Sequence, residues 1–319
     1  MNQDSNAIIT LCSHICVGDG VEPLEPKEYS ILAEALAAAG KSPKDLFDFS
    51  PDEFRAVLGP DTKQTERFKR LLDRNASMTF ELSEYQNMGI EVITRADTGY
   101  PKMLKRKTGN RCPPLFYYAG DLTLLDKPLV GYVGARTVTQ EDVDFTIQSV
   151  RKTVGHGYGV VSGGAKGIDT VSGTEALLCG GVSVEYLSDS LLKKLKKRDV
   201  IRDVQQGKLL LLSAAKPDAP FHVGMAMMRN QYIYAQSVAT MVVRSDLNKG
   251  GTWTGAAENL KNNLCPTLCW NQPYPGNQAL IQKGAIPIDS DWDGDVSRLS
   301  AKVPAVKETY EQASLFDMG

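Results

Sequence analysis

Histidine and cysteine are scarce in this sequence, which has three of the former and six of the latter among 319 residues. Six cysteines spread over a chain of this length do not make the disulfide framework of a small secreted protein, and they indicate a reducing compartment. No apolar run approaches the roughly 18 residues that cross a bilayer, and the N-terminus "MNQDSN" lacks the basic and then apolar order of a signal peptide. We therefore expect a cytoplasmic protein without a membrane contact.

Neither sign of charge is in excess, because 36 lysines and arginines stand against 38 aspartates and glutamates, for a net charge of -2. That balance excludes the broadly basic surface of chromatin-type proteins, so any contact with nucleic acid must be concentrated in a patch. The apolar fraction of 42% is sufficient for a full core in one large domain or two ordinary ones.

Several catalytic motifs are also absent. The strand ends carry no G-x-x-x-x-G-K-[ST] loop, G-x-G-x-x-G spacing or G-x-S-x-G elbow, so ATP hydrolysis, hydride transfer and serine hydrolysis lack their usual residues. The tightest group of possible metal ligands is Cys12, His14 and Cys16. Without a second cluster at finger-like spacing, this group indicates an apolar face rather than a zinc site. We predict no metal, no cofactor and no catalytic residue.

The chain divides into three predicted parts: a small helical domain (1–85), an α/β core (86–288), and a flexible linker with a C-terminal peptide (289–319). In the first part, Ser42 and Ser50 each precede a proline, as N-caps followed by proline at the first helical position do. One further helix is expected over residues 65–89.

From about Gly89 the pattern changes to β-like apolar runs that alternate with helical segments. Such an order is typical of an α/β fold, a doubly wound parallel sheet with helices on both faces. A capping box of Thr139 and Asp142 opens a helix whose apolar face includes Val143 and Val150. The runs expected to form strands are 128–134, 159–164, 182–188, 208–213 and 238–245.

Three of these strands end in loops that suit an anion. The loops are "VGART", "SGGAKGID" and "SDLNKGGTWTGAAE", and each brings glycine together with a cation. Glycines let backbone N–H groups approach a phosphate closely, and a helix that begins beyond them adds a partial positive charge. Because the carboxyl ends of parallel strands meet at one edge, we predict a shared phosphate-binding cleft. Its predicted residues in the loops are Gly134, Arg136, Ser162, Gly163, Gly164, Lys166, Gly167, Lys249, Gly250, Gly251 and Thr252.

The chain resembles the DNA-processing protein A family, also called Smf, in a series of short motifs that occur in the family's order. They read "VGAR", "SGGAKGID", "MRNQYIYAQS", "KGGTWTGAAE" and "GNQALIQKGAIPI", after an approach segment "TGYPKMLKRKTGNRCPPLFYYAGD". The resemblance covers about Gly89 to Ile288. It implies an extended Rossmann-like fold behind a small domain similar to sterile-alpha-motif modules, single-stranded DNA binding, a homodimer, and loading of the RecA recombinase.

By the same resemblance, DNA contact falls on motif positions that this chain keeps, namely Arg136, Ser162, Gly163, Lys166, Gly167, Arg229 and Asn230. Other family positions differ: "VSG" follows the G-I-D motif, "SDS" ends the next strand, Gln231 replaces a second arginine, and "WN" stands in place of Pro-Gly near the end. These differences affect the ancestral role more than the fold, and a divergent member could serve a mobile element or a defence locus.

Two other functions fit parts of the sequence. "GGTWTGAAE" is similar to the G-G-x-G-T-x-x-E signature of phosphoribohydrolases, in which Glu258 would stabilise a ribosyl cation in a nucleotide-cleaving enzyme. An open basic groove favours DNA, whereas a closed pocket that contains Glu258 favours a nucleotide. The segment "LLKKLKKRDVIR" is expected to form one short helix with six cations, either a solvated face or a contact for DNA or a scaffold partner.

The last residues, "EQASLFDMG", follow a polar linker and resemble the Q-x-[SD]-L-F peptide through which bacterial replication proteins bind the sliding clamp. Two adjacent large apolar residues after a linker are costly to leave in water, so they predict docking, either on the chain's own core or on the clamp. In the clamp, Gln312 would hydrogen-bond at the pocket rim, Ser314 would set the backbone, and Leu315 and Phe316 would fill the apolar pocket.

Overall fold

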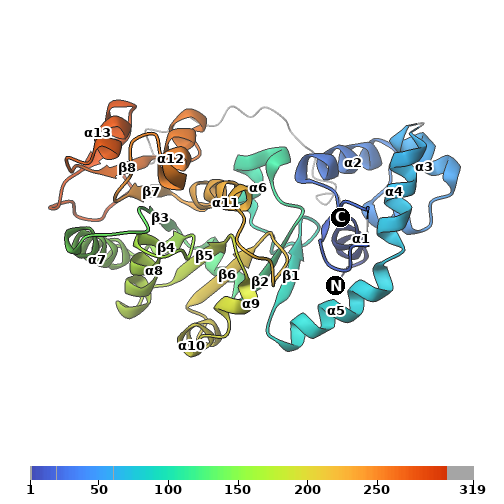
Figure 1. Cartoon of the computed structure of the whole chain (residues 1–319), viewed down its shortest axis with the longest axis horizontal. Coiled ribbons are helices and arrows are strands. Elements are labelled where there is room, and N and C mark those ends of the chain that lie inside the picture. Colours follow the sequence, from blue (N-terminus) through green and yellow to red (C-terminus); the bar gives the residue numbers. More distant parts are fainter. Residues whose placement is uncertain (1, 19, 60, 300–319) are drawn as a thin grey trace.

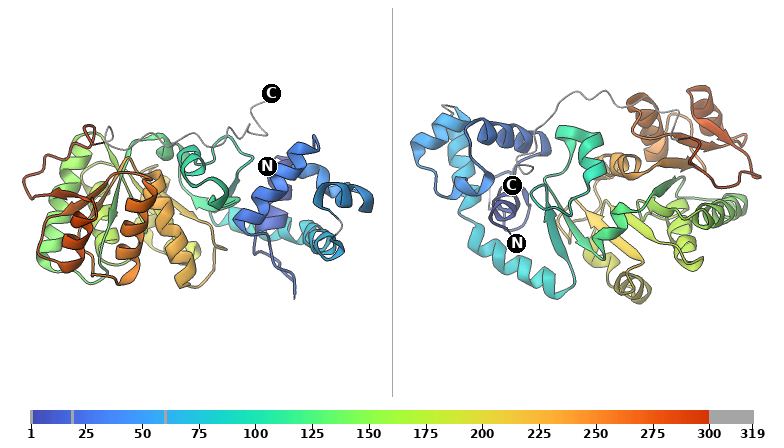
Figure 2. Two further views of the ribbon diagram at one scale, coloured as in Figure 1. Left: turned by 90° about the horizontal axis from the view of Figure 1, so that it is seen from above. Right: turned by 180° about the vertical axis from the view of Figure 1, so that it is seen from behind.

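The computed structural model describes residues 2–18, 20–59 and 61–299, which form an elongated molecule with a large sheet toward one end and a group of helices at the other (Figure 1). Two further views show the N-terminal helices beside the sheet rather than spread over it (Figure 2). No helix in these ranges is both long and apolar enough to cross a membrane.

One sheet of nine strands organises the described part of the chain, in the order β1-β2-β6-β5-β4-β3-β7-β8-β9. The strands from β6 to β9 in that order are parallel, which confirms the predicted parallel sheet. The antiparallel pairs β1·β2 and β2·β6 extend one edge beyond that prediction. The strands are β1 (Glu91–Thr94), β2 (Leu115–Ala119), β3 (Leu129–Val133), β4 (Gly159–Ser162), β5 (Ser183–Leu187), β6 (Leu209–Ser213), β7 (Ala239–Val242), β8 (Thr267–Trp270) and β9 (Ile286–Ile288).

Helices cover both faces of the sheet because successive side chains of a strand point to opposite sides. Leu129 and Val133 of β3 pack in one core with α11 and α12, whereas Val130 and Tyr132 pack in another with α7 and α8. The helices after β1 are α6 (Lys102–Thr108), η2 (Gly109–Arg111), η3 (Leu122–Asp126), α7 (Gln140–Gly155), α8 (Ile168–Leu178), α9 (Leu191–Lys194), α10 (Arg198–Gln205), α11 (Val223–Gln236), α12 (Gly250–Asn262) and α13 (Pro275–Gln282).

The direction of winding reverses at β3. From β3 the chain proceeds through β4, β5 and β6 to one side, and then returns to place β7, β8 and β9 on the other side. The helix α7 after β3 and the helix α12 after β7 lie on opposite faces. The loops that leave these two neighbouring strands therefore diverge and open a crevice at the carboxyl edge of the sheet.

Helix starts at the N-terminal end follow the sequence prediction, since Ser42 and Ser50 are the N-caps of η1 and α3 with proline directly after each. The capping box of Thr139 and Asp142 at α7 is also confirmed. The N-terminal helices are α1 (Gln3–Cys12), α2 (Pro26–Ala38), η1 (Pro43–Phe47), α3 (Pro51–Leu58), α4 (Thr62–Leu72) and α5 (Asn75–Asn87).

The single helix predicted over residues 65–89 is wrong, because the chain breaks between α4 and α5 at Arg74. The guanidinium of Arg74 turns inward and donates hydrogen bonds to the carbonyl oxygens of Thr10, Ser13 and Ile15. The break therefore lies at the residue whose side chain pairs these buried carbonyl groups.

The single basic helix predicted over residues 191–202 is also wrong, since this segment forms α9 and α10 with a turn between them. Leu191 and Val200 are both buried in the same hydrophobic cluster. Nine residues of straight α-helix would turn them about 180° apart, so only a break lets both reach one core.

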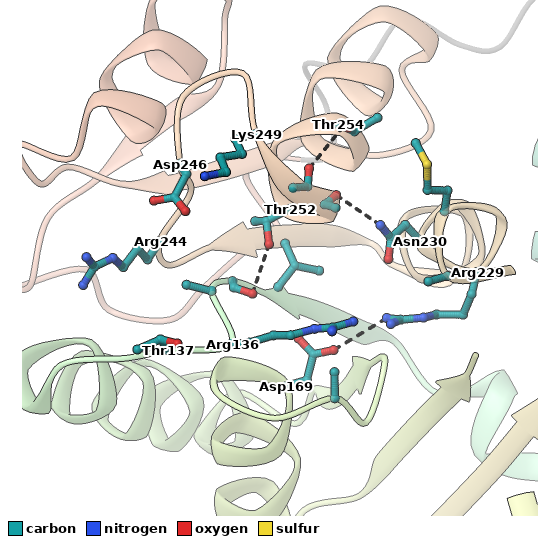
Figure 3. Close-up of a pocket in the computed structure, with 18 of the residues that line it drawn as sticks. Arg136, Thr137, Asp169, Arg229, Asn230, Arg244, Asp246, Lys249, Thr252 and Thr254 are labelled. Atoms are coloured by element: carbon teal, nitrogen blue, oxygen red, sulfur yellow. Dashed lines mark hydrogen bonds and ion pairs between the residues drawn. The ribbon is translucent and has the colours of Figure 1, made fainter. Parts of the chain in front are cut away.

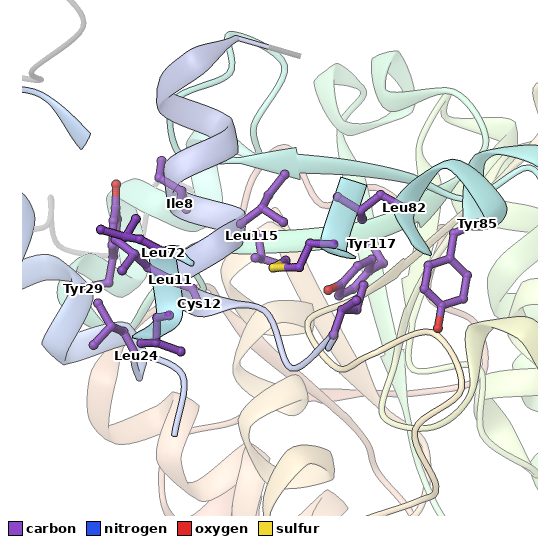
Figure 4. Close-up of a cluster of buried hydrophobic side chains, with 14 of the residues drawn as sticks. Ile8, Leu11, Cys12, Leu24, Tyr29, Leu72, Leu82, Tyr85, Leu115 and Tyr117 are labelled. Carbon is purple, nitrogen blue, oxygen red and sulfur yellow. The ribbon is translucent and has the colours of Figure 1, made fainter. Parts of the chain in front are cut away.

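One hydrophobic cluster joins the N-terminal helices to the sheet (Figure 4). Leu11 of α1 belongs to the same cluster as Leu115 and Tyr117 of β2. The hydroxyl of Tyr117 shares a 2.6 Å hydrogen bond with that of Ser13. The first part of the chain is thus helical, but it shares a core with the sheet. The boundaries of the three predicted parts, and the likeness of the first part to sterile-alpha-motif modules, stay predictions.

Candidate functional site

A pocket of about 800 Å³ fills the crevice between the ends of β3 and β7 (Figure 3). The loops after these two strands line it together with the N-terminal half of α11 and the start of α12. The predicted site residues that line it are Gly134, Arg136, Arg229, Asn230, Lys249, Gly250, Gly251 and Thr252.

The glycine loop after β4 contributes less to the pocket than its motif predicts. From this segment only Ala165 and Asp169 are among the lining residues. Ser162 and Gly163 are buried, and Lys166 is exposed outside the pocket. Of the three predicted loops, two therefore form the pocket, and the third lies beside them because β4 is the neighbour of β3.

Glycines let the loops after β3 and β4 interlock. A Cβ atom at Gly134 would meet the Ile168 side chain, and one at Gly167 would come within 2.8 Å of the Cα atom of Arg136. Gly167 also has a φ of +82°, in the left-handed region that favours glycine. The amide of Ile168 donates to the carbonyl oxygen of Ala135 at 3.3 Å. These glycines therefore set how closely the two loops pack.

Arg229 is buried at the pocket wall. Its Nη1 atom lies 3.6 Å from Oδ2 of Asp169, and the two side chains are 7% and 8% exposed. The same Oδ2 accepts a hydrogen bond from the amide of Gly163 at 3.1 Å. Burial raises the pKa of Asp169, and the attraction of Arg229 opposes that rise. Figure 3 shows Arg229 reaching toward Asp169 with Arg136 beside the pair. The carboxylate of Asp169 thus largely balances the positive charge of Arg229 inside the protein.

Two other cations are exposed at the pocket. Neither Arg136 nor Lys249 forms an ion pair with a residue that the structure describes. The Arg136 guanidinium lies 5.1 Å from the ring centroid of Phe221, in the loop before α11. Phe221, Val223 and Met227 all expose apolar surface along the pocket lining. These apolar residues belong to no motif and to no periodic pattern, so they could not be predicted as pocket residues.

The N-terminus of α12 faces the same space. Its N-cap, Lys249, makes no side-chain hydrogen bond to the first turn, so the first amide groups of the helix remain open to a ligand. The side-chain amide of Asn230 donates to the carbonyl oxygen of Gly251 at 3.1 Å, and the Thr252 hydroxyl donates to that of Gly134 at 3.0 Å. These two bonds hold the helix start against α11 and the loop after β3.

Arg244, which no motif indicated, closes one side of the pocket. Its Nη1 atom lies 3.0 Å from Oδ2 of buried Asp142, and its guanidinium lies 4.6 Å from the ring centroid of Tyr274. Burial raises the pKa of Asp142, but hydrogen bonds from the Thr139 amide and from Arg244 outweigh it and hold the pKa below its usual value. The charge of Arg244 is therefore committed to Asp142.

The remaining predicted groups lie apart from the pocket. Cys12 is buried in the core, where burial raises its pKa, while His14 is exposed and Cys16 donates a hydrogen bond to Glu81. Within the described ranges, no group of three or more histidine, cysteine, aspartate or glutamate residues is placed to hold a metal ion. Glu258 lies on α12 and is not among the residues that line the pocket. The predicted clamp peptide lies outside the described residues.

Curated relatives point to one family. The family model of DNA recombination-mediator protein A matches residues 91–294. Protein Smf of Synechocystis sp. is 26% identical over 286 residues, which cover 81% of this chain and 70% of that protein. DNA processing protein DprA of Bacillus subtilis is 28% identical over 218 residues, covering 66% and 72%. Its namesake in Streptococcus pneumoniae is 34% identical over 190 residues, covering 57% and 65%.

Solved structures share the fold. The X-ray structure of DprA from Streptococcus pneumoniae superimposes with a TM-score of 0.66 at 20% identity, covering 88% of this chain and 99% of that one. A structure of DprA from Helicobacter pylori, described for its single-stranded DNA binding mode, gives a TM-score of 0.52 at 24% identity, covering 66% and 94%. The family match spans more than half of the sequence and includes every loop of the pocket, and the chain therefore belongs to the DNA recombination-mediator protein A family, also called DprA or Smf.

Proposed function

We propose that this chain binds single-stranded DNA in the processing of DNA for recombination, and that the pocket between β3 and β7 holds phosphates of the strand. The names of the family and of its relatives support DNA processing, and the Helicobacter pylori relative is described as binding single strands. The observation that carries the proposal is a single pocket that combines the open N-terminus of α12 with the exposed cations Arg136 and Lys249.

Phosphate binding follows from the electrostatics of the pocket. The free amides at the start of α12, a helix of 13 residues, carry the partial positive charge of the helix dipole. Arg136 and Lys249 stand on the loops at either side of the helix start, and neither is neutralised by an ion pair with a described residue. The Nε atom of Arg229, a further donor in the wall, is buried without a hydrogen-bond partner in the described part of the chain.

The apolar side chains of the pocket favour a single strand over a duplex. Phe221 is 46% exposed and presents a ring to the same space as Arg136. An unpaired base stacked on such a ring gains about 1–3 kcal/mol, and the interaction tolerates any base. A duplex keeps its bases stacked on each other and cannot make this contact without opening.

The proposal is tested by removing the two exposed cations together, as Arg136→Ala with Lys249→Ala. Affinity for single-stranded DNA should fall, and the slope of log K against log salt should fall by about 1.4, since each phosphate contact to a single strand contributes about 0.7. A matched variant, Lys261→Ala with Lys283→Ala, removes the same charge from exposed positions outside the pocket lining and should bind as the wild type does. An unchanged slope in the pocket variant would contradict the proposal.

The alternative of a nucleotide-cleaving enzyme depends on Glu258. Because Glu258 lies outside the pocket lining, the geometry favours binding over cleavage. We accordingly expect no base release from nucleoside monophosphates. Release that disappears in Glu258→Gln would instead establish the enzyme.

Three partners are proposed from the sequence rather than from the pocket: a second copy of the chain, RecA and the sliding clamp. From the family resemblance we propose a homodimer that loads the RecA recombinase onto the bound strand, which assembly of recombinase filaments with and without the protein would test.

From "QASLF" we propose docking on the sliding clamp. A peptide of the C-terminal segment should then bind purified clamp with a Kd near 1 μM, about -8 kcal/mol. Binding that survives Leu315→Ala with Phe316→Ala would overturn the clamp proposal.

A further inference from the structure

The basic segment of α9 and α10 lies directly beside the glycine loop after β4. Lys194 of α9 places its Nζ atom 2.6 Å from Oε2 of Glu185 and 3.4 Å from the carbonyl oxygen of Gly164. Glu185 is buried in β5, and Gly164, at a φ of +62°, has no space for a side chain beside that carboxylate. Helix α9 is therefore fastened to the loop that presents Lys166.

The same helix is fastened to the loop that carries Phe221. The hydroxyl of Ser190 and the amide of Leu192 both donate to the carbonyl oxygen of Pro217, each at 3.0 Å. Pro217 and Phe221 belong to one loop between β6 and α11, and the Phe221 ring faces Arg136 in the pocket. The basic segment thus has a fixed position at the sheet edge where the pocket lies.

Most cations of the segment are exposed and not engaged by the protein. Lys194 is occupied by Glu185, and Arg202 pairs with Asp203 at 2.9 Å. Asp189 and Asp199 are the exposed acidic residues nearby in the sequence. Four exposed cations form no ion pair with a described residue, and we call them the basic surface: Lys193, Lys196, Lys197 and Arg198. In a chain with a net charge of -2, they make a local positive surface.

The strand order puts the basic surface and the pocket in one row. β5, β4, β3 and β7 are neighbours in that order. The loops at their carboxyl ends therefore follow one another over three steps of about 4.8 Å each. Along this edge the exposed cations stand in the same order: the basic surface after β5, Lys166 after β4, Arg136 after β3 and Lys249 after β7.

We infer that the basic surface is a second contact for the same DNA strand, which crosses it on leaving the pocket past Lys166. This inference rests on the proposed function and extends it. The contact is to phosphates, so it is independent of base sequence and strengthens with strand length. A strand that fills only the pocket gains nothing from the basic surface, whereas a longer strand does.

The test compares strands of two lengths. Lys193→Gln, Lys196→Gln and Lys197→Gln together remove three cations and leave Lys194 and the pocket unchanged. Binding is measured by fluorescence anisotropy at two salt concentrations with oligothymidylates of about 6 and about 30 nucleotides. Affinity for the long strand should fall about tenfold and its salt slope by about 2, at about 0.7 for each lost contact. Affinity for the short strand should stay as in the wild type.

The control variant carries Lys27→Gln, Lys63→Gln and Lys283→Gln, an equal charge change at exposed lysines on other elements. It should bind both strands as the wild type does. An equal loss in the control would show an effect of net charge and overturn the inference. Equal loss for both strand lengths in the test variant, or no loss for either, would overturn it as well. If the wild type binds neither strand, the proposed function itself fails.

Discussion

The pair of Arg229 and Asp169 depends on a glycine. At Gly163 the volume of a side chain is already occupied by the Arg229 guanidinium. Gly163→Ala therefore forces Arg229 away from Asp169 or shifts the loop, and separating a buried ion pair costs about 3–5 kcal/mol. We expect a loss of about 3 kcal/mol in the free energy of unfolding, measured by urea denaturation.

The matched control for this change is Gly155→Ala at the end of α7. Nothing lies within 4 Å of a Cβ atom added there, and its φ is not positive. The substitution should change the free energy of unfolding by no more than about 1 kcal/mol. Equal effects of the two substitutions would show that the contact between Gly163 and Arg229 is unimportant.

Individual residues of the pocket could be predicted from the sequence to the extent that a motif contains them. Arg136, Asn230 and Lys249 stand in motifs, and the structure places them in the pocket lining. The pairing of Arg229 could not be predicted, because Asp169 lies sixty positions earlier and approaches only in the folded sheet. Phe221 lies in a loop without periodicity, so neither its exposure nor its contact with Arg136 has a signal in the sequence.

At the start of α7, Asp142 joins three elements. Its carboxylate accepts hydrogen bonds from the Thr139 amide at 2.8 Å, from Arg244 at 3.0 Å and from the Tyr274 hydroxyl at 3.0 Å. Its folded pKa is lowered, so its stabilisation is present above the unfolded pKa and lost as pH falls through the folded one. Asp142→Asn should cost about 2 kcal/mol at neutral pH.

The pH dependence separates this effect from simple loss of packing. The difference in unfolding free energy between wild type and Asp142→Asn should shrink below about pH 4, the range of an unfolded aspartate. Denaturation midpoints measured from pH 7 to pH 3 check this. Asp144→Asn, at an exposed position on the same helix, should change stability by less than about 0.5 kcal/mol throughout. A difference that is constant with pH would rule out the ionised carboxylate as its cause.

Elements were predictable where local signals suffice. Caps at Ser42, Ser50 and Thr139 mark helix starts, and apolar runs mark the parallel strands. The breaks between α4 and α5 and between α9 and α10 have no such signal. The first depends on the carbonyl groups that Arg74 satisfies in α1 and beyond it, and the second on a core that must receive both Leu191 and Val200.

Over the whole molecule, the shared core of helices and sheet is the feature that sequence periodicity could not predict. Periodicity shows that a helix has an apolar face but not what covers it. Here the covering surface is β2, the antiparallel strand between the edge strand β1 and β6, together with side chains from β6. The two predicted regions consequently meet through Tyr117 and its neighbours, which gives a reason for them to unfold together.

Tyr117→Ala tests whether they do. All three tryptophans, Trp253, Trp270 and Trp292, belong to the sheet region, so their fluorescence reports on the sheet, whereas far-ultraviolet circular dichroism also reports on the N-terminal helices. Because one core spans both regions, the fluorescence and the circular dichroism signals should change in a single urea transition with the same midpoint. Tyr117→Ala removes a buried ring and its hydrogen bond to Ser13. The free energy of unfolding obtained from either signal should therefore fall by about 4 kcal/mol.

Phe80→Ala on α5 is the control, since this residue is 70% exposed. Its removal should change the free energy of unfolding obtained from either signal by no more than about 0.5 kcal/mol. The two outcomes that would contradict a shared core are distinct. Separate transitions in the wild type would show that the helices unfold independently of the sheet. A shift of the circular dichroism signal alone in Tyr117→Ala would show that the sheet does not depend on the helices that cover β2, because the stability of a cooperative unit is lost as a whole.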